Sequence, residues 1–141
     1  INFRKWFNEN KNLLNKDEQQ NFLELARYSM GVNGEHKKEE EEVLLGYKFE
    51  CQLVEYKANR QDEIEKIITI LGASTKKVRK IILIEILGIF QADGEICNKE
   101  TEFLNKLSRE FNIEEYEVKR IKRWVEAMND IVQEGYELIS K

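Results

Sequence analysis

Carboxylates around one glycine turn are the residues of this sequence best suited to chemistry. Ala92-Asp93-Gly94-Glu95 places two carboxylates in a turn, and Glu100 follows five residues later. Carboxylate oxygens suit hard divalent cations such as calcium, magnesium or manganese, whereas zinc prefers sulfur and nitrogen. A bound cation would also relieve the repulsion between like charges. We therefore predict that Asp93, Glu95 and Glu100 are metal ligands.

A second copy of this pattern lies 60 residues earlier. Residues 30–44, placed over residues 90–104, match at Gly34/Gly94, Glu35/Glu95, Glu40/Glu100, Glu42/Glu102 and Leu44/Leu104. Five identities in fifteen positions, all at the turn and the helix after it, indicate an internal duplication. The second ligand set is then Asn33, Glu35 and Glu40. If the two units are related by a pseudo-twofold axis, we expect the two turns to share one cation.

The same residues also fit a purely structural role. Asp93 and Asn33 can end their helices, with the next glycine at positive φ. Glu100 and Glu40 can occupy the third helical position and accept a hydrogen bond from the cap backbone. The sequence leaves both interpretations open. It argues against a calcium EF-hand, because Ile89 and Gln91 would stand at the first and third loop positions, where oxygen ligands are expected.

The element that leads into the Asp93 turn is the most apolar stretch of the chain. Ile81 to Phe90 contains only two residues, Glu85 and Gly88, that are not large and apolar. The pattern has helical spacing, and Thr75 can cap its start. No second strand-like stretch is present to pair with it. We predict a central helix from Thr75 to Gln91, buried on most sides.

Six further helices follow from apolar residues spaced three or four apart. The sequence therefore predicts a single all-α domain over residues 1–141, with about seven helices and pseudo-repeated helix–turn–helix units at about 20–59 and 80–112. The six other helices are expected at Asn2–Leu14, from Asp17 to about Asn33, from Lys37 to about Asn59, Asp62–Gly72, Asn98–Phe111 and Glu114–Ile139.

Composition limits the partners. The chain has 141 residues, no proline and a net charge of −4, so general affinity for nucleic acid is disfavoured. A basic run, Lys119-Arg120-Lys122-Arg123, is interleaved with Glu117 and Glu126, which predicts an exposed salt-bridged face. No apolar run approaches the ~20 residues of a membrane span, so direct membrane insertion is not expected.

Catalysis and localisation can be judged from the few reactive residues. The only histidine, His36, could activate Cys51 or Cys97 as a nucleophile, but no residue that would orient it is identifiable, so we do not expect an enzyme. Cys51 and Cys97 lack metal-type spacing and are interpreted as free thiols of a reducing compartment, which predicts a cytoplasmic protein.

The Asp93 turn and its helices resemble the TerB-like family, known from tellurite-resistance proteins and from the N-terminal domain of a membrane-anchored DnaJ-type co-chaperone. The resemblance is carried by Ala92-Asp93-Gly94-Glu95-Ile96, Glu100 and Phe103-Leu104, and by Phe111-Asn112-Ile113-Glu114-Glu115, and covers about residues 20–125. The chain departs from the family where Asn33 replaces an aspartate and where Cys97 and Lys37 replace capping serines.

The resemblance implies an all-helical fold of two pseudo-symmetric helix groups, divalent-cation binding at the acidic turns and a role in stress responses. Our leading hypothesis is therefore a non-catalytic TerB-like module with a protein partner and a cation at the paired turns. The alternative is a protein-interaction or scaffold domain of a larger protein with no metal site.

Overall fold

Seven α-helices and two short 3₁₀ turns make up the computed structural model, which describes residues 3–34, 38–92 and 95–140. These residues contain no β-strand, so the predicted all-α class is confirmed. The helices are α1 (Phe3–Asn10), α2 (Lys16–Met30), α3 (Lys38–Glu50), α4 (Ile64–Gly72), α5 (Lys76–Gln91), α6 (Asn98–Glu110) and α7 (Glu115–Ile139).

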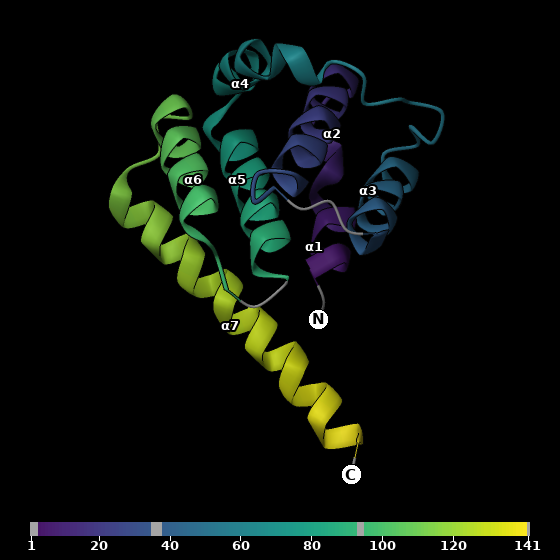
Figure 1. Ribbon diagram of the computed structural model, residues 1–141, viewed down its shortest axis with the longest axis vertical. Coiled ribbons are helices and arrows are strands. Elements are labelled where there is room, and N and C mark those ends of the chain that lie inside the picture. The colour runs from purple at the N-terminus through teal and green to yellow at the C-terminus, as the bar shows by residue number, and fades with distance from the viewer. Residues whose placement is uncertain (1–2, 35–37, 93–94, 141) are drawn as a thin grey trace.

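Helix α5 is the centre of the bundle, as the apolar run predicts. It packs against α1, α2, α6 and α7, and Figure 1 shows it between α6 and α2. The side chains of Ile82, Ile86 and Phe90 are buried, which confirms the predicted inward face. Thr75 caps the helix by accepting a hydrogen bond from the Val78 N–H at 3.3 Å.

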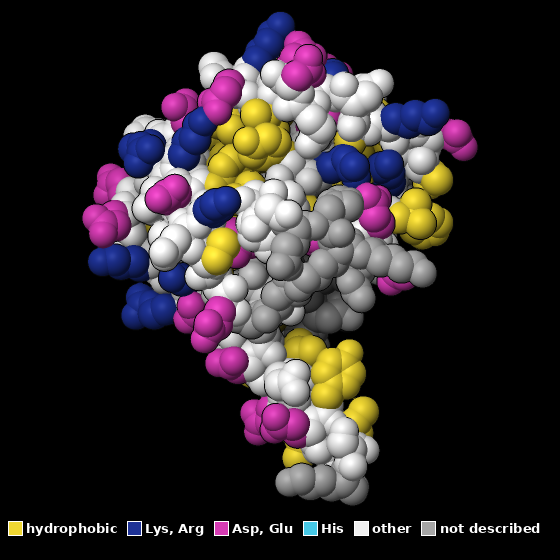
Figure 2. All heavy atoms as spheres, in the orientation of Figure 1, with side chains coloured by type: hydrophobic (Ala, Val, Ile, Leu, Met, Phe, Trp, Pro, Cys, Tyr) yellow, Lys and Arg dark blue, Asp and Glu magenta, His cyan; other side chains and the backbone are white. Residues whose placement is uncertain are grey.

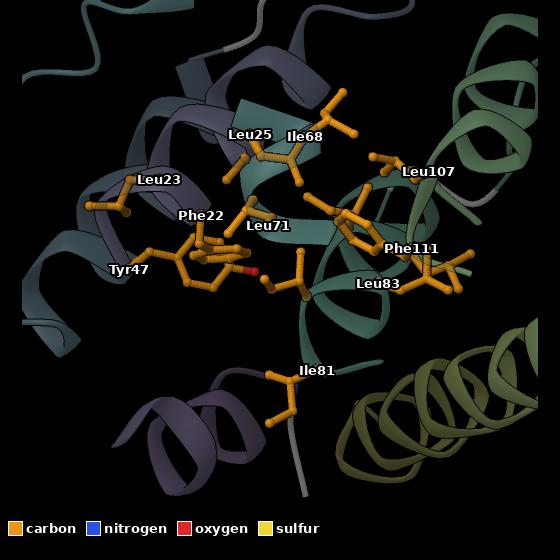
Figure 3. Close-up of a cluster of buried hydrophobic side chains, with 14 of the residues drawn as sticks. Phe22, Leu23, Leu25, Tyr47, Ile68, Leu71, Ile81, Leu83, Leu107 and Phe111 are labelled. Atoms are coloured by element: carbon orange, nitrogen blue, oxygen red, sulfur yellow. The ribbon is translucent and has the colours of Figure 1, made fainter. Parts of the chain in front are cut away.

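One hydrophobic core joins the helices. Figure 3 shows Phe22 and Tyr47 meeting between α2 and α3, while Leu107 of α6 and Phe111, directly after α6, lie on the other side, near Leu83. The ring centroids of Phe22 and Tyr47 are 5.1 Å apart with their planes nearly perpendicular, a favourable edge-to-face arrangement. The core therefore continues across both halves of the chain.

The helix predicted from Lys37 to about Asn59 is wrong in its second half. Helix α3 ends at Glu50, because Gln52 has a left-handed backbone with φ of 58°. The Leu53 N–H then donates to the Lys48 carbonyl at 2.7 Å, which closes the helix end. Glutamine gives little sequence signal for such a turn, because glycine or asparagine is the usual residue there.

Two smaller predictions also differ from the structure. Helix α2 is capped by Asn15, not Asp17: Asn15 Oδ1 accepts from the Glu18 N–H at 2.8 Å, and Glu18 accepts in return from the Asn15 N–H. On α3, Val43 is exposed although its spacing suggested the core. At the start of α2, the cap that forms lies two residues before Asp17.

Helix bounds agree with the offset of 60 residues that the sequence suggests. Shifted by 60, the bounds of α3 are those of α6. The second non-glycine residue with positive φ is Asn112, at 52°, which stands 60 residues after Gln52. The Ile113 N–H donates to the Ser108 carbonyl at 3.0 Å, as Leu53 does to Lys48. Superposition of residues 20–59 on 80–112 remains a prediction.

The last helix extends beyond the bundle. Its first half packs against α5, and its C-terminal half projects away from the other helices in Figure 1. Within the described ranges, none of the helices combines the length and the apolar character needed to cross a bilayer.

Candidate functional site

The two predicted acidic turns are only partly described by the structure. Asp93 and Glu35 lie outside the described residues, as does His36. Asn33 is half-buried in the turn after α2, and the Gly34 N–H donates to the Gly31 carbonyl at 3.1 Å. Gly34 has φ of 84°, as predicted for the glycine of this turn.

Glu100 has the structural contact that the capping interpretation predicts. Its side chain is 8% exposed, and Oε1 accepts a hydrogen bond from the Cys97 N–H at 3.0 Å. Glu95, two residues before Cys97, is exposed, and Glu40 is half-buried near the start of α3. The cap uses one oxygen of Glu100, so it does not by itself decide whether the second oxygen binds a cation.

No ligand cluster is formed by the described part of the predicted site. Among residues 3–34, 38–92 and 95–140, no three acidic, cysteine or histidine side chains lie close enough to hold a metal ion together. A complete site would need Asp93 or Glu35, which those ranges omit. The metal ligands therefore stay a prediction from the sequence.

The turn after α2 lies beside the beginning of α6. Gly31 and Val32 line one open cavity of about 570 Å³ together with Lys99 and Glu102. Lys99 stands in the first turn of α6, directly after the second acidic turn. The turn after α2 and the first turn of α6 thus lie on the same side of the molecule.

This cavity forms a groove between the end of α2 and one face of α6. We call it the α2–α6 groove, and its lining residues are Arg27, Tyr28, Gly31, Val32, Gln61, Lys99, Glu102, Phe103 and Lys106. The residues from α6 share a face because their spacing is three, four and seven. In Figure 2, hydrophobic side chains gather on this face among α2, α4 and α6, with Lys and Arg side chains beside them.

Aromatic rings form the floor of the α2–α6 groove. The ring centroids of Tyr28 and Phe103 are 5.5 Å apart, and Phe103 in turn meets the buried Phe90 edge-on at 6.3 Å. Tyr28 is 36% exposed and Phe103 is half-buried. The floor is therefore fixed to the core of α5 and offers an apolar surface to solvent.

Cationic side chains flank this floor. Arg27 pairs with Glu41 at 2.9 Å, and Lys106 pairs with Glu65 of α4. Both pairs are exposed to solvent, where such pairs contribute ~0.2–1 kcal/mol and exchange readily. Lys99 is exposed at the groove edge. The groove thus presents positive charge around aromatic rings.

Two carboxyl groups are buried in the core: among the described residues, the side chain of Glu24 accepts three hydrogen bonds, whereas that of Glu85 accepts one. Glu24 is fully buried and accepts hydrogen bonds from the Arg60 N–H at 3.0 Å, from Gln61 Nε2 at 2.8 Å and from the Tyr56 hydroxyl. It fastens the loop after α3 to α2. Burial and the hydrogen bond to Glu24 raise the pKa of Tyr56 to about 12.

Glu85 is the buried carboxyl with few partners. Its side chain is fully buried on α5, and the Tyr47 hydroxyl donates to Oε1 at 3.0 Å. Oε2 has no hydrogen-bond partner among the described residues. Burial raises the pKa of Glu85 well above the ordinary value, and the negative charge of Glu50 adds to this, while the Tyr47 hydrogen bond opposes it. The group is therefore protonated over a wide pH range.

The two cysteines are free thiols, of which Cys97 is exposed and Cys51 is buried and unreactive. Cys51 is buried, and this burial raises its pKa to about 11, so it remains a neutral thiol at physiological pH. Two ammonium groups approach the end of α3 beside it: Lys11 donates to the Glu50 carbonyl at 2.5 Å and Lys16 to the Cys51 carbonyl at 2.6 Å. These lysines cap a helix C-terminus, which is a structural role.

Sequence reasoning missed the α2–α6 groove. The spacing of Lys99, Phe103 and Lys106 could have placed them on one face of a helix. Nothing in the sequence indicates that Tyr28 packs against Phe103, because this contact joins helices of the two halves.

The prediction that Glu117 forms ion pairs within the basic run of α7 is wrong. Glu117 turns to Lys76 and Lys80 of α5, at 3.2 and 3.4 Å.

Comparison of the chain with family models, curated proteins and solved structures finds no significant match. The TerB-like resemblance therefore rests on the sequence motif alone.

Proposed function

We propose that this chain is a non-catalytic, TerB-like module that binds an acidic segment of a partner protein in the α2–α6 groove. The observation that carries the proposal is the pair of packed rings, Tyr28 and Phe103, which lie at a tilt to each other between cationic side chains. An apolar floor with a few polar groups at its edge is the usual composition of a binding site. The TerB-like resemblance extends the proposal to a cytoplasmic stress-response pathway.

Charge and shape select the partner. Arg27, Lys99 and Lys106 outnumber the one acidic residue of the groove, Glu102, so a peptide with Asp or Glu is complementary. A large apolar side chain of that peptide would pack on the two rings. Carboxylates of the peptide would replace Glu41 and Glu65 as partners of Arg27 and Lys106. Because these are exchanges of exposed ion pairs, the affinity should be modest.

Peptide selection tests this function without knowledge of the natural partner. We expect random peptides displayed on phage and selected on this chain to be enriched in Asp or Glu around one aromatic or aliphatic residue. Binding of the selected peptides should fall at least tenfold in the Lys99→Glu/Lys106→Glu variant. The matched control is Lys77→Glu, an exposed lysine at the start of α5 outside the groove. Selection of basic peptides, or equal binding to both variants, would show that the groove is not the site.

A divalent cation at the acidic turns is the second candidate. The observation that favours it is that Gly31 and Val32 of the first turn line one cavity with Lys99, which follows the second turn. Neighbouring turns could bring Asn33, Glu35 and Glu40 toward Asp93, Glu95 and Glu100. Calcium, magnesium or manganese would be the suitable ion, with an affinity on the order of 10⁻⁴ M or weaker.

A further inference from the structure

The C-terminal half of α7 is an apolar helix surface that the bundle leaves uncovered. Val125 is fully buried and Met128 is 7% exposed, but no described residue after Met128 is buried. Ile131 is 64% exposed and Leu138 is 72% exposed. Figure 2 shows hydrophobic side chains along this projecting end. A helix that carries large apolar residues beyond its own core is suited to packing against another helix.

One stripe runs along the outward side of the whole helix. Tyr116, Trp124, Ile131 and Leu138 are all exposed and follow one another at intervals of eight, seven and seven residues. Intervals of seven keep side chains on one face of a helix. Val125 and Met128 are buried instead, and Val118 packs against the core, so the exposed stripe is a separate surface. We call it the α7 stripe.

Small and charged residues complete the α7 stripe. Arg120 lies between Tyr116 and Trp124, Ala127 lies at the middle, and Glu134 lies between Ile131 and Leu138. Arg120, Ala127 and Glu134 are exposed, and neither Arg120 nor Glu134 forms an ion pair within the part of the chain that the structure describes. The small side chain of Ala127 permits close approach of a second helix.

The net charge along α7 changes sign near this midpoint. Before Trp124, the basic residues Lys119, Arg120, Lys122 and Arg123 outnumber the acidic Glu115 and Glu117, and only acidic charged residues follow it in this helix, namely Glu126, Asp130, Glu134 and Glu137. Two parallel copies would place like charges together. Two antiparallel copies would place the acidic half of each helix along the basic half of the other, which is favourable.

We propose that the α7 stripe binds a second copy of this chain as an antiparallel helix pair. With Ala127 of both copies at the twofold axis, Trp124 packs on Ile131 of the second copy. Tyr116 packs on Leu138 of the second copy, and Arg120 pairs with its Glu134. Each contact occurs twice, as twofold symmetry requires. The overlap from Tyr116 to Leu138 is about 33 Å long at 1.5 Å per residue.

The residues of the α7 stripe are accessible to a second helix. Tyr116, Trp124, Ile131 and Leu138 are all exposed, and the stripe lies beside the buried face of α7 that contains Val125 and Met128. The exposed Lys119–Glu115 pair, at 3.4 Å, lies beside the stripe and is not broken. The proposal is independent of the α2–α6 groove, which is formed by other helices.

Oligomeric mass measured by light scattering tests the proposal. We expect a dimer at micromolar concentration, twice the 16.8 kDa of one chain. Arg120→Glu alone and Glu134→Arg alone should each give monomers, because each variant places like charges opposite one another. A mixture of the two variants should form dimers again, because both cross-pairs are then of opposite charge.

Lys122→Glu is the matched control. It is an exposed basic residue of the same helix half that lies off the α7 stripe, so its dimer should resemble the unaltered chain. Circular dichroism should show that all variants remain helical. A monomeric unaltered chain would overturn the proposal. So would a dimer that either single variant leaves intact, or variants whose mixture stays monomeric.

Discussion

Replacement of Glu85 by glutamine should stabilise the protein by an amount that grows with pH. Glu85 is fully buried, and burial raises its pKa well above the ordinary value of 4.5. Glutamine has nearly the same shape and keeps an oxygen that can accept from the Tyr47 hydroxyl. The substitution therefore removes the ionisable group while the packing stays the same.

The sign of this pH dependence follows from the number of protons bound by the folded and the unfolded chain. Below pH 4.5 the carboxyl is protonated in both the folded and the unfolded chain, so it adds no pH dependence. Above pH 4.5 the unfolded chain loses the proton while the folded chain keeps it, until the pH reaches the raised pKa. In that window the free energy of unfolding falls by about 1.4 kcal/mol per pH unit. The total is set by how far burial raises the pKa of Glu85, and this total is the gain expected for Glu85→Gln above that window.

Urea unfolding at several pH values between 4 and 8 measures the effect. The difference between Glu85→Gln and the unaltered chain should be small near pH 4 and increase steadily with pH. Glu24→Gln is the matched control, because Glu24 is equally buried but accepts three hydrogen bonds. An amide NH₂ facing those donors should destabilise the fold. A Glu85→Gln difference that is constant with pH would refute the reasoning.

Four other predictions follow from packing and from the acidic turns. Ile86→Ala should lower the free energy of unfolding by roughly 2–5 kcal/mol in chemical denaturation, because a fully buried side chain leaves a cavity. Gly72→Ala should destabilise by about 1–3 kcal/mol, because a Cβ there would lie 2.8 Å from the Glu110 carbonyl oxygen. Gly135→Ala, where a Cβ meets nothing within 4 Å, should instead stabilise the exposed helix by about 0.5–1 kcal/mol. Millimolar calcium, magnesium or manganese should raise the melting temperature if the acidic turns bind a cation, and Asp93→Ala should abolish that rise; an unchanged melt with all three ions would leave only the capping role.

The helical class could be predicted because the apolar spacing is unambiguous. The run from Ile81 to Phe90 has helical periodicity and a good N-cap in Thr75, and α5 occupies that place. Local signals of this kind depend on residues close in sequence. The offset of 60 residues predicted a repeated helix pair, and the bounds of α3 and α6 agree with that offset although the predicted end of α3 did not.

The end of α3 could not be predicted from local signals. Gln52 adopts a left-handed backbone although its type does not favour it. The loop that follows is held by contacts to distant residues, such as the Tyr56 hydroxyl with Glu24. Tertiary hydrogen bonds of this kind override local propensity and have no signature in the nearby sequence.

Only the part of the candidate site that depends on local contacts could be predicted. The capping contact of Glu100 joins residues three apart, so the motif indicated it. The Tyr28–Phe103 floor joins residues far apart in the chain, and the burial of Glu85 depends on helices on several sides. Such features follow from the packing of whole helices.

Chemical-shift mapping by nuclear magnetic resonance tests the central claim, binding in the α2–α6 groove, most directly. The probe is an acidic peptide obtained by selection on this chain, titrated into the isotopically labelled protein. If the peptide binds in the groove, we expect the largest amide shifts at groove residues and none at the projecting end of α7. The groove residues are Gly31, Val32, Lys99, Phe103 and Lys106. Shifts confined to residues outside the groove, or no saturable shifts at all, would contradict it.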